Sequence, residues 1–167
     1  MWHKYFLYEN GKLFHKERGR EEFMSDRSFK VWNKRYAGKS AGCKSPQGYV
    51  IVTVNSKSFK AHRVIWEMHN GTIPEGYEID HKDQIKNNNL IVNLRLATRS
   101  QNVSNSSPRK ASSLPKGVSP DGKRFKATIR IEGNLKYLGT FNTPAEAQIA
   151  YIRKGREIYN EFFYLGA

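Results

Sequence analysis

The chain has 167 residues, of which 38% are hydrophobic and 13% aromatic, enough for one modest domain or two small ones. Its single cysteine, Cys43, excludes a disulfide framework and a cysteine-based zinc site. The formal net charge of +14 favours a nucleic-acid partner over a merely solvated cationic surface.

A membrane partner is not expected. No apolar run approaches the ~18 residues that a membrane span needs, and no signal peptide opens the chain. With one cysteine, the chain suits a reducing, cytoplasmic setting.

Two β-hairpins are predicted in the first sixty residues. In "YFLYENGKLFHK", Asn10-Gly11 lies between apolar runs and indicates a two-residue turn. A second strand pair is predicted around Asn55-Ser56 in "GYVIVTVNSKSFK". The Lys/Arg-rich segment 18–44 between them is expected to be a loop. It is either solvated or a DNA-contacting arm, since aromatic side chains alternate with its charges at Phe29, Trp32 and Tyr36.

A short helix is predicted from Ala61 to Asn70-Gly71, with Val64, Ile65 and Met68 on one face. For His62 and Arg63 two interpretations stay open: the helix only covers the sheet, or Arg63 touches a phosphate.

The segment "EIDHKDQIKNNNLIVNLRLATRSQN", residues 78–102, predicts the order strand, loop, strand, helix. A short strand leads into Asp80 and His81, a polar loop follows, and "LRLA" alternates as a returning strand. Thr98 and Gln101 then form a capping box that starts a helix, with Asn102 in its first turn.

These residue types suit phosphodiester hydrolysis. The carboxylate of Asp80 and the amide oxygen of Asn102 are hard ligands suited to Mg²⁺, which keeps several waters and takes phosphate oxygens into its shell. If the first strand packs against the helix, both oxygens can converge beside His81. A neutral imidazole there can take a proton from water, because histidine titrates near neutral pH.

The C-terminal third predicts a second small module. Residues 106–113 are expected to be a linker, because they are rich in Ser and Pro. In "RFKATIRI" apolar and basic residues alternate, and Gly133-Asn134 is expected to turn the chain into "LKYLGTF". A capping box at Thr143–Glu146 starts a helix that runs to about residue 160.

The Asp80-His81 pair, the "NNN" and "NLR" elements ending at Arg95, and Asn102 resemble the core of phage HNH endonucleases, the ββα-metal nucleases that include homing enzymes. The resemblance implies that Asp80 and Asn102 hold one divalent cation, Mg²⁺ or Mn²⁺, and that His81 is the general base. Asn93 would orient His81 or the loop, Arg95 would contact DNA, and the products would carry 5′-phosphate and 3′-hydroxyl ends. Gln84-Ile85 stands where the family pattern has Gly-Asn.

The segment "GVSPDGKRFKATIRIEGNLKYLGTFNTPAEAQIAYIRKGREIY" resembles an AP2 DNA-binding domain, a three-stranded sheet with a helix behind it. The resemblance implies DNA contacts from the exposed face of the sheet, at Lys116, Arg124, Lys126, Thr128, Arg130 and Tyr137.

We therefore expect an α+β protein: an HNH nuclease domain at 1–105, a linker at 106–113, and an AP2-like domain at 114–167. The predicted function is a metal-dependent DNA endonuclease that nicks or cuts double-stranded DNA and takes no small-molecule substrate. The alternative is a DNA-binding regulator with an inert nuclease core. The resemblance also implies a phage origin, hence a place in the host cytoplasm.

Overall fold

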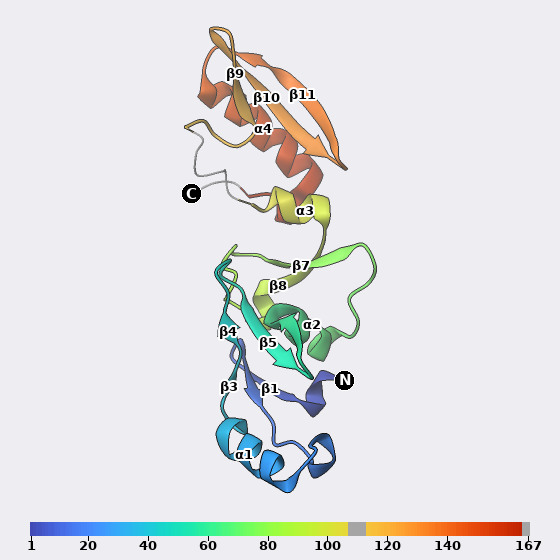
Figure 1. Cartoon of the computed structure of the whole chain (residues 1–167). Helices are drawn as coiled ribbons and strands as arrows, with labels where there is room; N and C mark the ends of the chain where they lie inside the picture. Colours follow the sequence, from blue (N-terminus) through green and yellow to red (C-terminus); the bar gives the residue numbers. More distant parts are fainter. Residues whose placement is uncertain (107–112, 165–167) are drawn as a thin grey trace. The chain divides into compact units, whose positions relative to one another are not determined.

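The computed structural model describes residues 1–106 and 113–164, and their contacts define two compact units, Met1–Leu96 and Ala97–Ala167 (Figure 1). The chain is a mixture of helices and strands, as expected. None of the helices in the described residues is long and apolar enough to cross a membrane.

The first unit holds eight strands, of which the last runs two residues beyond it, together with two α-helices and three 3-10 turns. In chain order they are η1 (Trp2–Lys4), β1 (Phe6–Glu9), β2 (Lys12–His15), η2 (Arg20–Glu22), α1 (Asp26–Tyr36), β3 (Ser40–Ala41), β4 (Cys43–Lys44), β5 (Val50–Val54), β6 (Lys57–Lys60), α2 (Ala61–Asn70), β7 (Tyr77–His81), η3 (Ile91–Asn93) and β8 (Leu94–Thr98).

Both predicted hairpins are confirmed. The turn between β1 and β2 is made by Asn10 and Gly11, with φ of 45° and 78°, and the turn between β5 and β6 by Asn55 and Ser56, with φ of 49° and 61°. Two successive positive φ values give the turn whose twist matches that of antiparallel strands, and asparagine and glycine tolerate that backbone best.

Helix α2 is confirmed from Ala61 to Asn70, and Gly71 ends it with φ of 82°. Val64 and Ile65 are almost completely buried and belong to one apolar core with Phe6, Leu13 and Val52. This core joins the hairpins to α2 and supports strand β7, whose Ile79 belongs to the same cluster.

The expected loop at 18–44 is wrong, because its middle is helix α1. The hydroxyl of Ser25 caps the helix by accepting a hydrogen bond from the backbone N–H of Ser28, and the hydroxyl of Ser28 accepts one from the backbone N–H of Ser25. The aromatic side chains of α1 pack within the unit: the ring of Trp32 lies 5.4 Å from that of His15, and the guanidinium of Arg18 lies 4.2 Å from the Trp32 ring centre. The aromatic residues of this segment are therefore occupied in packing.

The second unit begins with helix α3 (Arg99–Ser104) and continues with β9 (Val118–Asp121), β10 (Arg124–Ile131), β11 (Asn134–Phe141), α4 (Pro144–Tyr159) and η4 (Asn160–Phe162). Strands β11, β10 and β9 form an antiparallel sheet in that order. Helix α4 packs on one face of it, where Ala127 and Ile129 are buried against Ala147 and Tyr151. The predicted alternation in β10 is confirmed.

Two local details of this unit differ from prediction. The turn between β10 and β11 is made by Glu132 and Gly133, with φ of 48° and 84°, and not by Gly133-Asn134. Thr143 caps α4 as expected, but the carboxylate of Glu146 accepts from the backbone N–H of Asn142, one residue before the cap.

The division between the units falls after Leu96, so α3 is grouped with the C-terminal unit and not with the predicted nuclease domain. The hydroxyl groups of Ser100 and Tyr159 lie 2.8 Å apart, which links α3 to α4. The predicted boundaries at 105 and 114 stay predictions, and most of the predicted linker (107–112) lies outside the described residues.

Candidate active site

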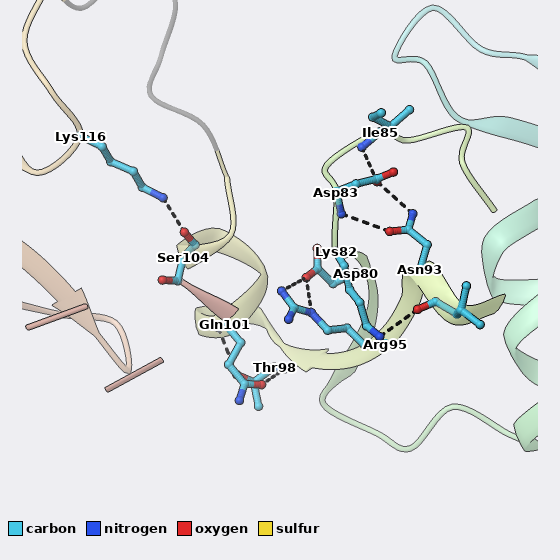
Figure 2. A network of polar contacts seen from close by, with 11 residues as sticks. Asp80, Lys82, Asp83, Ile85, Asn93, Arg95, Thr98, Gln101, Ser104 and Lys116 are labelled. Atoms are coloured by element: carbon cyan, nitrogen blue, oxygen red, sulfur yellow. Dashed lines mark hydrogen bonds and ion pairs between the residues drawn. The ribbon is translucent and has the colours of Figure 1, made fainter. Parts of the chain in front are cut away.

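Strands β7 and β8 form a two-stranded sheet, with the polar loop between them and α3 directly after β8. The predicted order of strand, loop, strand and helix is thus confirmed. At the end of the sheet the backbone N–H of Lys82 donates to the carbonyl of Asn93 (2.9 Å). Thr98 and Gln101 form the predicted capping box of α3 (Figure 2).

Asn93 holds the loop together. Its side-chain oxygen accepts from the backbone N–H of Asp83 (3.2 Å), and its Nδ2 donates to Asp83 Oδ1 and to the carbonyl of Asn88, both at 2.9 Å (Figure 2). Partial burial raises the pKa of Asp83, but hydrogen bonds from Asn88 and Asn93 outweigh it and hold that pKa below its usual value. Of the two roles expected for Asn93, these contacts favour the one in shaping the loop.

Asp80 is buried in β7 and forms an ion pair with Arg95 of β8. Atoms Nε and Nη2 of Arg95 both lie 2.9 Å from Oδ2 of Asp80, and both side chains are at most 10% exposed (Figure 2). A DNA contact would need the Arg95 guanidinium at the surface, where the structure does not place it. Its contacts instead orient the carboxylate of Asp80.

His81, also buried, has a partner that the sequence did not reveal. Its Nε2 lies 3.0 Å from Oδ1 of Asn89, which is 2% exposed. An amide oxygen only accepts hydrogen bonds, so this contact places a proton on Nε2 and leaves Nδ1 as the nitrogen that can act as a base. Asn89 lies in the predicted polar loop, and no spacing signal distinguishes it from Asn87 and Asn88.

His62 of α2 lies against the ring of His81, with centroids 4.9 Å apart and the rings nearly perpendicular. It is buried, and its Nδ1 has no hydrogen-bond partner among the described residues. Burial, with a smaller contribution from His81, lowers the pKa of His62 to about 3. A neutral ring at this position adds no charge beside His81 at neutral pH.

The low pKa of His62 makes folding sensitive to acid. Its ordinary value is 6.5, so between pH 6.5 and about 3 the unfolded chain binds more protons and the free energy of unfolding falls as the pH falls. From pH 7 to pH 5 the wild type should lose about 2 kcal/mol more than His62→Phe, which keeps a ring but cannot titrate. Urea unfolding at both pH values measures this difference.

His3→Phe is the matched control, because His3 is exposed. It should lose as much stability as the wild type between the two pH values. An equal loss in all three proteins would contradict the assignment to His62.

Gln84, which stands where the family pattern has glycine, adopts φ of 63°. This left-handed backbone is the conformation that glycine favours. Gln84 thus adopts this backbone although it is not glycine, and its backbone N–H donates to the carbonyl of His81 (2.9 Å).

The donor set fits a hydrated divalent cation better than an all-protein metal cage. In residues 1–106 and 113–164 no group of three or more His, Cys, Asp or Glu side chains could hold a metal ion. Asp80 offers one carboxylate, and Mg²⁺ needs only one or two protein oxygens when waters and phosphates supply the rest. Asn102 lies in α3, in the second unit, so its convergence with Asp80 on one ion stays a prediction.

Most of the DNA contacts predicted for the C-terminal module share one face of its sheet. Ala127 and Ile129 of β10 point to α4, so the alternate residues lie on the other face. Tyr137 is the register partner of Thr128, and a bulge in β11 keeps Leu138 on the core side. The face therefore carries Arg124, Lys126, Thr128, Arg130 and Tyr137.

Lys116 does not belong to that face. Its ammonium group donates to the carbonyl of Ser104 (2.8 Å, Figure 2) and to those of Val103 (3.1 Å) and Ser106 (2.6 Å) at the end of α3. Helix α3 ends at Ser104, and a cation is favourable at a helix C-terminus. Burial lowers the pKa of Lys116 to about 8. The structure gives this residue a capping role in place of the expected DNA contact.

Residues 59–104 match the HNH endonuclease family, and the matched segment contains Asp80, His81, Asn93 and Asn102. The chain is 39% identical over 80 residues to Protein 3.8 of Escherichia phage T7, covering 46% of this chain and 66% of that protein. It is 34% identical over 131 residues to an uncharacterized HNH endonuclease of Acanthamoeba polyphaga mimivirus, covering 77% of this chain and 64% of that protein.

Among solved structures, the chain is similar to the HNH homing endonuclease I-HmuI, with a TM-score of 0.41 and 26% identity over 60% of this chain and 51% of that one. At this TM-score the likeness is too weak to place individual residues. The chain spans slightly less than two thirds of the two viral relatives.

Proposed function

We propose that the protein is a divalent-metal-dependent DNA endonuclease that cuts double-stranded DNA and is targeted by the outer face of its C-terminal sheet. The observation that carries the proposal is the segment 59–104, which matches the HNH endonuclease family and in which the buried Asp80 and His81 are each held by a specific partner. The mimivirus relative, which is named an HNH endonuclease, and the net charge of +14 support it.

His81 takes a proton from the attacking water through Nδ1, because Asn89 holds the Nε2–H. Asp80, oriented by Arg95, and Asn102 would hold the cation. When bound, Mg²⁺ or a similar cation such as Mn²⁺ supplies charge stabilisation at the leaving 3′ oxygen. With one carboxylate and one amide from the protein, the site should bind Mg²⁺ weakly until DNA phosphates complete the shell.

Incubation of supercoiled plasmid with the protein tests this function directly. Relaxed or linear plasmid is expected with Mg²⁺ and none with EDTA. DNA binding without cleavage over a range of divalent cations would refute the endonuclease and favour the regulator with an inert core.

Arg130 tests the targeting role of the sheet. It is exposed on β10, and Arg130→Ala should keep the cleavage rate on saturating DNA. If it reads a base, the variant should lose about 1–3 kcal/mol of affinity at specific sites. If Arg130 touches only phosphate, binding should weaken alike on all sequences. The slope of log K against log salt should then fall in magnitude by about one.

Arg153→Ala is the matched control, because Arg153 is exposed on α4, the helix that covers the opposite face of the sheet. Arg153→Ala should change the sequence specificity and the slope of log K against log salt less than Arg130→Ala does. Equal effects of the two variants would contradict a targeting role. Point variants suit this test better than truncation, since α3 receives contacts from Lys116 and Tyr159 of the same unit.

A further inference from the structure

A tyrosine ring lies beside the two buried histidines. The ring centre of Tyr49 is 5.3 Å from that of His62 and 6.2 Å from that of His81. The carbonyl of Tyr49 accepts from the backbone N–H of Ser45 (2.7 Å), which closes a tight turn before β5. The ring is thus anchored at the edge of the candidate active site.

Two ammonium groups meet at this ring. Lys60, at the end of β6, places its Nζ 4.5 Å from the ring centre, and Lys86, from the loop after β7, places its Nζ 5.1 Å away. Lys86 also donates to the carbonyl of Gln47 (3.1 Å). Three segments far apart in the sequence therefore bring two exposed cations to one side of His81.

Acidic groups also lie near this ring, because burial and then the charges of Glu78 and Asp80 raise the pKa of the Tyr49 hydroxyl. Within the part of the chain that the structure describes, no carboxylate forms an ion pair with Lys60 or Lys86. Because each ammonium group lies about 5 Å from the same ring centre, the two are at most about 10 Å apart. This separation is close to the Debye length at 0.1 M salt. Their repulsion is thus only partly screened, and an anion bound near both ammonium groups relieves it.

We propose that Lys60 and Lys86, held on the ring of Tyr49, bind a backbone phosphate of the DNA strand beside the bond to be cut. The inference rests on the proposed endonuclease function and adds a binding site to it. A phosphate at this position fixes the strand next to His81, whereas the outer face of the C-terminal sheet selects the sequence. The ring keeps both long side chains extended towards one point and so reduces the entropy that they lose on binding.

The test is the salt dependence of binding to a short DNA duplex in EDTA, so that no strand is cut. The double variant Lys60→Gln/Lys86→Gln is compared with Lys12→Gln/Lys57→Gln, which removes the same charge from exposed strand positions. Loss of the contact to one phosphate lowers the slope of log K against log salt by about one. The control pair should lower it by less than half as much, and Tyr49→Phe, which keeps the ring, should leave it unchanged.

Equal slopes for the two double variants would overturn the phosphate site. That result leaves the endonuclease proposal intact if the wild type still cuts plasmid with Mg²⁺. The reverse result, a slope reduced only in Lys60→Gln/Lys86→Gln together with no cleavage by the wild type, supports the phosphate site and refutes the endonuclease. Thermal unfolding of each variant within a few degrees of the wild type shows that the fold is kept.

Discussion

Replacing His81 with alanine is expected to lower the rate of DNA cleavage by about 10²–10⁴-fold, the range typical of a lost general base. DNA affinity should stay nearly unchanged, because a general base contributes only in the transition state. Single-turnover cleavage of plasmid with Mg²⁺ and a separate binding measurement in EDTA give the two quantities.

His3→Ala is the matched control, since His3 is exposed and lies outside residues 59–104, which match the HNH endonuclease family. It should cut at the wild-type rate. If His81→Ala also cut at that rate, the assignment of the base would fail. A loss of affinity as large as the loss of rate would point to a role in holding DNA or the loop and not in proton transfer.

Replacing Arg95 with methionine is expected to lower the free energy of unfolding by about 3–5 kcal/mol, because it leaves the buried carboxylate of Asp80 without its counter-charge. The two side chains are 10% and 6% exposed, so little water can replace the guanidinium. Urea unfolding at pH 7 measures the change. The exposed Arg63 of α2 supplies the control, and Arg63→Met should shift stability by no more than about 0.5 kcal/mol.

The ion pair of Asp80 and Arg95 also allows a test of the metal site. Asp80→Ala should stay at background cleavage at every Mg²⁺ concentration, because the carboxylate ligand is gone. Arg95→Met, assayed below its unfolding transition, should still respond to Mg²⁺. If Arg95→Met lost the response to Mg²⁺ and Asp80→Ala kept it, Asp80 would not be the metal ligand.

Local signals accounted for most of the secondary structure. Asn10-Gly11 and Asn55-Ser56 favour the positive φ values that a two-residue hairpin turn requires, and both hairpins formed there. The capping box at Thr98 and Gln101 started α3 as predicted. These signals act within a few residues, so they are readable without knowledge of the tertiary structure.

The missed helix α1 shows the limit of such reading. Its cap is a reciprocal pair of serines, a weaker signal than the usual Glu or Gln at the third helical position. The aromatic residues Phe29, Trp32 and Tyr36 have the spacing of one face of a helix, and this spacing could have predicted α1. Instead, the segment was expected to be a loop, either solvated or a DNA-contacting arm, because these aromatic residues alternate with basic ones.

The sequence by itself determined the hairpins, the strand-loop-strand-helix order of the HNH segment and the two-sided strand β10, because each follows from turn chemistry or periodicity. Only the tertiary structure decided which partner each polar side chain has. Arg95 pairs with Asp80 across β7 and β8, Asn89 holds His81, and Lys116 caps α3. Spacing along the chain cannot predict such choices, since burial and long-range packing select one partner among many chemically equivalent side chains.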